Sequence, residues 1–246
     1  MRPARTLAVA VRVLQQVRRD PRTLAMLVVV PCVLMALLWW MYRDVPGPVS
    51  PFDRSGPALL AIFPFVVMFL VTSVTTLRER SSGTLERLLA MPLGRLDLLL
   101  GYGLAFGLLA AIQSVVAVAV SVWLLGMHVH SAWLLLLMAV ADAVLGTSLG
   151  LFVSAFAHTE FQAVQFMPAL VVPQILVCGL FVPRAQLPGV LHAISDVLPL
   201  SYAVDAMRHL TVGATSTGVA GDLGVVVGYA VALLVLGAAT LRRRTP

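Results

Sequence analysis

Residues 78–101 read RERSSGTLERLLAMPLGRLDLLLG, the longest polar interruption between two strongly apolar segments of the chain. Gly83 can cap a short helix that has Glu86 at its third position, and Pro92 ends it. Leucines fall on one side of that helix at helical spacing, namely Leu85, Leu88 and Leu89. We therefore expect an amphipathic helix between two membrane spans. It is either a docking element for a soluble partner or a solvated loop whose leucines rest on the bilayer.

The composition is that of a membrane protein. The 246 residues are 60% hydrophobic and only 11% charged, and the mean hydropathy is +0.97. A soluble domain of this size carries far more charge. We expect an all-α polytopic membrane protein forming a single transmembrane domain over residues 1–246, with almost no sequence left for a separate soluble domain.

All seventeen basic residues are arginine, and the chain contains no lysine. A phosphate-binding P-loop needs its lysine to reach the nucleotide phosphates, so this chain cannot carry that motif. Energy for any active process must come from another polypeptide or from an ion gradient. The arginines cluster beside apolar segments, which indicates membrane topology and not binding to nucleic acid.

Six segments are long and apolar enough to cross a bilayer: residues 23–42, 57–77, 98–125, 132–155, 163–182 and 221–241. With the N-terminus inside, thirteen arginines lie on cytoplasmic segments and four lie outside. This bias predicts that both termini and the 78–97 loop face the cytoplasm.

Two further segments carry structure of their own. Residues 1–22 predict a helix on the cytoplasmic membrane surface, with a charged tail as the alternative. Its expected apolar stripe is Leu7, Val11, Leu14 and Val17, while Arg5, Arg12 and Arg19 recur every seven residues on another face. Residues 183–220 are interrupted by prolines yet apolar, so we expect one or two short helices dipping into the outer leaflet or capping the spans. A disordered outer loop is the alternative.

At two places the residues resemble a known family. The stretch ERSSGTLERLLAMPLGRLDLLLG, residues 79–101, is similar to the loop of ABC-2 type exporter permeases, with the pattern ExxxGTLExLxxxPxxRxxxLxG. The stretch LFVPRAQLPGVLHAISDVLPLSYAVDAMRHL, residues 180–210, resembles the outer segment of the drug-resistance branch of that family. The order of elements fits along essentially the whole chain.

The resemblance implies roles for particular residues. The coupling helix and its flanks, which in such exporters contact a separate ATPase subunit, would include Glu79, Arg80, Gly83, Thr84, Glu86, Arg87, Pro92 and Arg95. The connecting helix would carry Arg5, Arg12 and Arg19, and the outer helices would carry Pro199, Tyr202 and Arg208. Two ATPase subunits, which bind ATP and Mg²⁺, would serve a dimer of this chain in a bacterial cell membrane. We expect no cofactor on this chain itself.

Polar residues inside the spans are candidates for a substrate path: Asp142, Gln113, Gln165, Met167 and Gln174. Asp142 is costly in a membrane unless it is paired or protonated, and its expected partners are Gln113, Ser114, Thr147 and Ser148. The alternative for Asp142 and the glutamines is structural hydrogen bonding between helices. The small-residue pairs are expected to permit close helix contact, and they are Gly103 with Gly107 and Gly146 with Gly150.

Other functions are weakly supported. His128 and His130 lack a third ligand nearby, so we expect no metal site, and Cys32 and Cys178 should be free thiols. No hydrolase motif is present. We expect a non-enzymatic permease subunit that exports a hydrophobic or amphiphilic compound, such as a drug or lipid. An ion-coupled carrier or an accessory membrane protein is the alternative.

Overall fold

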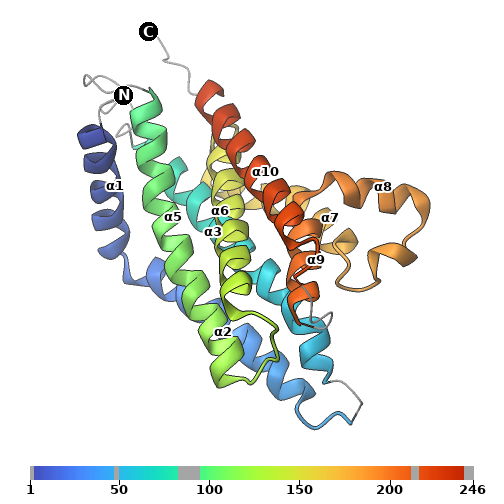
Figure 1. Ribbon diagram of the computed structural model, residues 1–246. Helices are drawn as coiled ribbons and strands as arrows, with labels where there is room; N and C mark the ends of the chain where they lie inside the picture. Colours follow the sequence, from blue (N-terminus) through green and yellow to red (C-terminus); the bar gives the residue numbers. More distant parts are fainter. Residues whose placement is uncertain (1–2, 47–49, 83–94, 212–215, 241–246) are drawn as a thin grey trace.

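A computed structural model describes residues 3–46, 50–82, 95–211 and 216–240, and every regular element in these ranges is a helix (Figure 1). Within these ranges, six helices are long and apolar enough to cross a membrane. They are α2 (Pro21–Tyr42), α3 (Pro51–Ser81), α5 (Arg95–Ala119), α6 (Ala132–Ser154), α7 (Glu160–Val177) and α10 (Val219–Thr240). A π-helical turn, η1 (Val120–Leu124), continues α5. The prediction of an all-helical, six-span membrane protein is confirmed.

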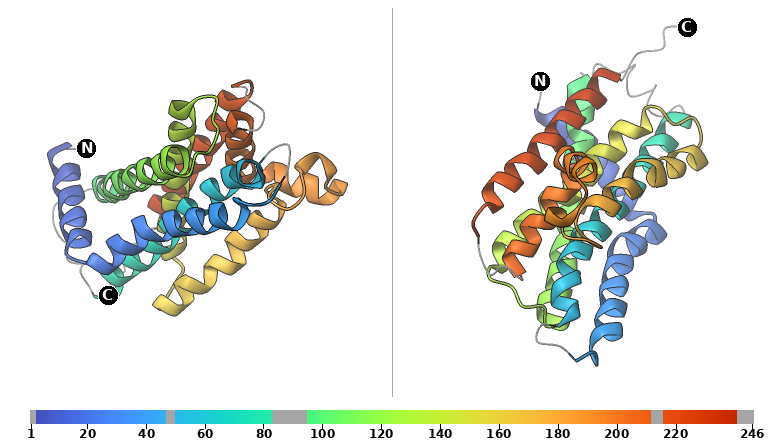
Figure 2. Two further views of the ribbon diagram at one scale, coloured as in Figure 1. Left: turned by 90° about the horizontal axis from the view of Figure 1, so that it is seen from below. Right: turned by 90° about the vertical axis from the view of Figure 1, so that its right-hand side faces the viewer.

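The remaining helices are short. They are α1 (Pro3–Arg18), the 3-10 turn η2 (Arg184–Gln186), α8 (Gly189–Val197) and α9 (Pro199–Thr211). The last three lie in residues 183–220, where one or two short helices were expected, so the alternative of a disordered loop is wrong for the described part of this segment. Their position relative to the membrane stays a prediction. In Figure 1 and in the left view of Figure 2, α8 lies at the margin of the bundle and extends away from it.

We call the end of the bundle where α3 ends and α5 begins the inner end, and the end where α2 ends and α3 begins the outer end (Figure 1). α3 begins at Pro51, six residues before the predicted span. The Ser50 hydroxyl oxygen accepts a hydrogen bond from the Phe52 amide at 3.2 Å, and Asp53 lies in the first turn, where a negative charge favours the helix dipole. Charged residues expected in a loop thus start the helix.

The centre of the bundle is the contact between α3 and α6. A Cβ added at Gly146 would lie 2.4 Å from the Phe65 carbonyl oxygen, and one at Gly150 would lie 2.6 Å from that of Phe69. Only glycine allows this approach of backbone to backbone. The pair on α5 behaves differently, because no described atom comes within 4 Å of a Cβ added at Gly103 or Gly107. The expected close contact is therefore present at one pair, and the described residues provide none at the other.

The N-terminal helix α1 packs along α5 with a face that differs from the predicted stripe. Its buried residues are Thr6, Val9, Ala10, Val13 and Val17, whereas Leu7 is 61% exposed and Val11 is 43% exposed. Of the predicted stripe, Val17 is buried and Leu14 is half-buried against the same core, so the packed face overlaps the predicted one only at its later residues. A Cβ at Gly101 of α5 would lie 2.6 Å from the Val9 side chain, so this glycine is needed where the helices cross.

The outer turn between η1 and α6 is tied to two other elements. The Asp53 carboxylate accepts a hydrogen bond from the His128 amide at 3.1 Å, and its other oxygen lies 3.0 Å from His128 Nδ1. The His130 amide donates to the Leu210 carbonyl at 2.7 Å. Both cysteines are free thiols, as expected.

Candidate functional site

Three consecutive charged residues, Arg78, Glu79 and Arg80, end α3 at the inner end of the bundle. Successive side chains on an α-helix point about 100° apart, so three neighbours can reach three different elements. Arg78, Glu79 and Arg80 each contact a different helix. Ser81 and Ser82 separate them from residues 83–94, which lie outside the described part of the chain.

Glu79 contacts α1. Its side chain is only 2% exposed, and one carboxylate oxygen lies 3.6 Å from the Arg12 guanidinium, which is 35% exposed. This is an ion pair at a distance longer than a hydrogen bond. A buried carboxylate needs a nearby cation or donors to offset its desolvation, and Arg12 is the cation that α1 supplies.

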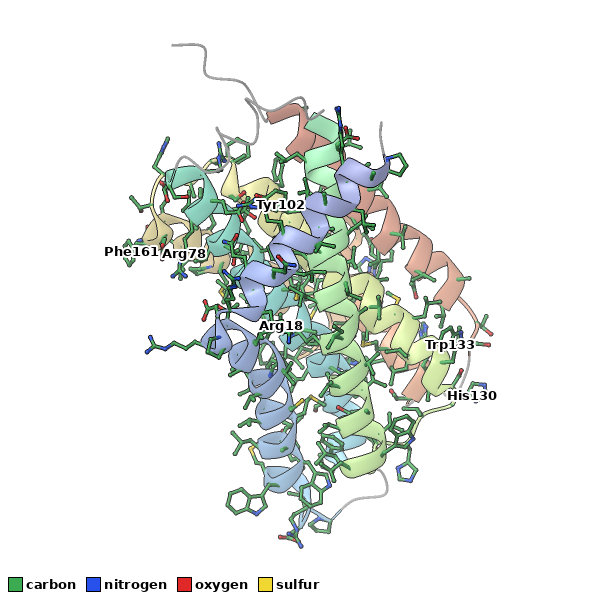
Figure 3. All side chains as sticks on the ribbon, turned by 90° about the vertical axis from the view of Figure 1, so that its left-hand side faces the viewer. Arg18, Arg78, Tyr102, His130, Trp133 and Phe161 are labelled. Carbon is green, nitrogen blue, oxygen red and sulfur yellow. The ribbon has the colours of Figure 1, made fainter. Side chains whose placement is uncertain are left out.

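Arg78 contacts the start of α7. Its Nε lies 2.8 Å and its Nη2 lies 3.0 Å from the two carboxylate oxygens of Glu160, which is the bidentate geometry that a guanidinium favours. Glu160 is the first residue of α7, and the Thr159 hydroxyl caps that helix by accepting from the Gln162 amide at 3.2 Å. In Figure 3, Arg78 lies beside Phe161, the next residue of α7.

Arg80 contacts the end of α6. Its Nη1 donates to the Ser154 carbonyl oxygen at 2.7 Å. Ser154 is the last residue of α6, where carbonyl groups have no partner within the helix. Arg80 therefore satisfies one of these carbonyls and joins the ends of α3 and α6.

The corner between α1 and α2 is set by Asp20. Its carboxylate accepts from the Thr23 hydroxyl at 2.7 Å and from the amides of Arg22 and Thr23, each at 3.2 Å. These hydrogen bonds, the one from the Thr23 hydroxyl first, lower the pKa of Asp20 below its ordinary value. The carboxylate is thus an ionised helix cap, and Arg18, Arg19 and Arg22 around it are exposed.

The predicted coupling residues are distributed as follows. Gly83, Thr84, Glu86, Arg87 and Pro92 lie outside the described residues, and Arg95 is described only as the first residue of α5. Glu79 and Arg12, predicted separately, are brought together. Arg5 is half-buried on α1, and Arg19 lies just beyond the end of that helix.

One predicted outer residue, Tyr202, packs against Arg184, which was not among the predicted site residues. The Arg184 guanidinium bonds the carboxylates of Asp196 and Asp205, its Nε donates to the Ser195 hydroxyl at 3.0 Å, and it lies 5.1 Å from the centre of the Tyr202 ring. The Tyr202 hydroxyl donates to the Asp196 carbonyl at 2.7 Å.

The two other predicted outer residues lie on the same helix. Pro199 is buried and begins α9, and Arg208 is half-buried on that helix. Gly179 has a φ of +95°, and a Cβ there would lie 3.5 Å from atoms of both Arg184 and Arg208. This conformation favours glycine where the chain turns between α7 and η2.

The substrate-path candidates fall into two groups. Asp142 and Gln113 are enclosed within the bundle, at 0% and 1% exposure, whereas the others lie on α7. On α7, Gln165 is exposed, Met167 is half-buried against the core, and the Gln174 amide donates to the Leu170 carbonyl at 3.0 Å.

The expected hydroxyl partners of Asp142 bond backbone carbonyls instead, so that prediction is wrong. Ser114 donates to Ala139, Thr147 to Ala143 and Ser148 to Val144. Among the described residues, no group forms a hydrogen bond with either Asp142 side-chain oxygen or with the Gln113 amide. Asp142 stands on the α6 stripe that continues through Gly146 and Gly150, the stripe that meets α3.

Two residues of the inner end, Arg78 and Glu160, were not predicted as site residues. A signal for Glu160 was present, because Thr159 followed by Gln162 three residues later is a helix-start pattern that puts Glu160 in the first turn. Nothing local to the sequence indicates its pairing with Arg78, which stands 82 residues earlier.

The chain is similar to a known protein family over most of its length. The family model described as ABC-2 type transporter matches residues 4–212, most of the chain. The chain belongs to the ABC-2 type transporter family. The resemblance stated from residues 79–101 and 180–210 is thus confirmed.

This ABC-2 chain is similar to several named transporter proteins. The Probable multidrug ABC transporter permease YbhS of Escherichia coli is 28% identical over 156 residues, 63% of this chain and 41% of that protein. ABC transporter G family member 20 of Dictyostelium discoideum is 28% identical over 166 residues, which are 67% of this chain and 23% of that protein. The Linearmycin resistance permease protein LnrN of Bacillus subtilis is 24% identical over 180 residues, which are 72% of this chain and 47% of that protein. The chain thus spans less than half the length of each of these relatives.

Proposed function

We propose that this chain is the permease subunit of an ATP-driven exporter that moves a hydrophobic or amphiphilic compound out of the cytoplasm or inner leaflet. The observation that carries the proposal is the inner end of α3. There, three consecutive residues contact α1, α6 and α7 at the start of the stretch whose sequence resembles a coupling helix and its flanks. A force applied to that segment would reach three helices at once.

The energy would come from a separate cytoplasmic ATPase subunit that binds ATP and Mg²⁺. The absence of lysine supports this division of labour, because the chain has no P-loop. Two ATPase subunits and two copies of this permease would form a symmetric assembly, since each permease chain has one such segment.

The membrane is proposed to be the bacterial cell membrane, with both termini in the cytoplasm, as the arginine distribution predicts. Relatives named for multidrug transport and linearmycin resistance support an amphiphilic cargo. The substrate path would involve α7, on which Gln165, Met167 and Gln174 are carried.

The test is co-purification of the tagged chain with cytoplasmic ATPases of its own organism, followed by measurement of ATP hydrolysis in lipid nanodiscs. The double charge reversal Glu86→Arg with Arg87→Glu is expected to abolish ATPase binding or uncouple hydrolysis. The matched control is Arg43→Glu with Asp44→Arg, which reverses an exposed ion pair (3.4 Å) at the outer end. If no ATPase binds the wild type, or if both double variants bind it equally, the proposal is wrong.

A further inference from the structure

We infer that Arg78 and Glu160 form a mechanical link that makes the inner end of α7 follow the inner end of α3. The inference rests on the proposed function, because it assigns one step of the coupling between ATPase and substrate path. It adds two positioning residues, and α7 as the helix that they move.

The geometry of the pair suits such a link. Two nearly parallel hydrogen bonds, of 2.8 and 3.0 Å, fix both the distance and the orientation of the two side chains. Glu160 stands in the first turn of α7, where its charge is also favoured by the helix dipole. The Gln162 side chain accepts from the His158 amide at 2.8 Å and so holds the turn that precedes this helix.

An apolar contact lies beside the ion pair. Leu77, Ala157 and Ala163 form a buried cluster of their own, separate from the main core, and Phe166 packs against it. Adjacent residues of α3, Leu77 and Arg78, therefore hold the start of α7 by packing and by charge. The link includes both contacts, but only the ion pair fixes orientation.

The rest of α7 contains two sites where it can bend. This helix packs mainly against α3, with Val171 and Val177 buried and Leu176 exposed. Pro168 and Pro173 stand inside it, and each removes a backbone hydrogen bond and favours a bend. A displacement of the inner end can therefore move the first turns of α7 and be absorbed at the prolines. Gln165 and Met167 lie before both prolines.

The pair contributes little to folding, which makes the inference testable. Both side chains are about half exposed, and exposed ion pairs contribute little to stability because water screens them. Variants of Arg78 and Glu160 are therefore expected to fold and insert, so that an effect on coupling can be measured separately.

The experiment uses the full complex with its ATPase in nanodiscs, in a Cys32→Ala and Cys178→Ala background. Spin labels at Ser81 and Phe161, both exposed, report the link itself. Labels at Phe161 and Trp133 report movement of α7 relative to the outer end of α6. Distances are measured by pulsed electron paramagnetic resonance, without nucleotide and with ATP and vanadate.

In the wild type we expect one narrow Ser81–Phe161 distance in both states and a nucleotide-dependent shift of the Phe161–Trp133 distance. Glu160→Arg should broaden the first distribution at least twofold and reduce the shift by at least half. Glu160→Gln, which removes the charge without repulsion, should have a smaller effect in the same direction. Exchange of the charges, Arg78→Glu with Glu160→Arg, should restore both readouts.

Asp44→Arg, a matched charge reversal in the exposed outer pair, is the control and should leave both readouts unchanged. The inference is overturned if Glu160→Arg keeps the narrow distribution and the full shift, or if the exchange restores neither. Failure of the proposed function is distinguishable from this result. If the wild type bound no ATPase, the proposed function would fail, while the nucleotide-free Ser81–Phe161 distance would still test the link.

Discussion

The two ends of this bundle are both held by arginine contacts, but the contacts are arranged differently. At the inner end, three adjacent residues of α3 reach α1, α6 and α7, and Arg78 and Glu160 are 82 residues apart in sequence. At the outer end, Arg184 gathers partners that all lie within residues 184–205.

The two clusters differ in whether they can transmit a movement from one helix to another. A cluster built within one short segment keeps that segment in shape whatever the spans do around it. A cluster that joins helices far apart in sequence makes those helices move together. The Arg184 cluster is therefore a self-contained unit, whereas the inner end is where a movement of α3 is distributed to other helices.

The largest effect is expected at Arg184. Arg184→Gln leaves the carboxylates of Asp196 and Asp205 near each other without the Arg184 cation. Because these carboxylates are 46% and 28% exposed and partly screened by water, the loss should be about 2–3 kcal/mol, below that of a fully buried pair. Hydrogen exchange should increase throughout residues 184–205 and little elsewhere. Arg54→Gln, a change at an exposed arginine of the outer end, is the control. If exchange at the inner end increased equally, the outer cluster would not be self-contained.

The middle of α3 should be the next most sensitive. Gly146→Ala places a methyl group where the Phe65 carbonyl stands 2.4 Å away, so α3 and α6 must separate. We expect a loss of about 2 kcal/mol, the range of overpacked cores, seen as a lower melting temperature in detergent. Gly103→Ala makes the same change on α5, where no described atom is within 4 Å, and should leave the melting temperature unchanged or raise it.

Hydropathy and length were sufficient to predict the six spans and the short outer helices, because the bilayer sets both. The buried face of each helix was harder to predict. α1 offers two apolar stripes, and the choice of the Val9 and Val13 stripe over Leu7 and Val11 depends on what fits against Gly101 of α5. The two glycine pairs have the same spacing, and only their neighbours distinguish them.

Polar partners were the least predictable part of the site. Thr147 and Ser148 use their hydroxyls on carbonyls one turn back in their own helix, a local bond that competes with any partner such as Asp142. The partners of Arg184, and the pairing of Arg78 with Glu160, depend on which helices pack side by side. Arg12 and Glu79 were both predicted for coupling from the family pattern, but their contact with each other was not.

The smallest effect on stability, and the sharpest test of the inner end, concerns that contact. Arg12→Gln leaves the buried Glu79 carboxylate without its cation, whereas Glu79→Gln leaves Arg12, which is 35% exposed, free to be hydrated. Arg12→Gln should lower the free energy of unfolding by about 1–2 kcal/mol, and Glu79→Gln should lower it clearly less. Thermal unfolding of the two single variants and of the double variant measures the difference. The double variant should resemble Glu79→Gln, because it contains no buried charge. Equal losses in the two single variants would mean that Glu79 is not buried as a charge, and that the inner end is held by Arg78 and Arg80 alone.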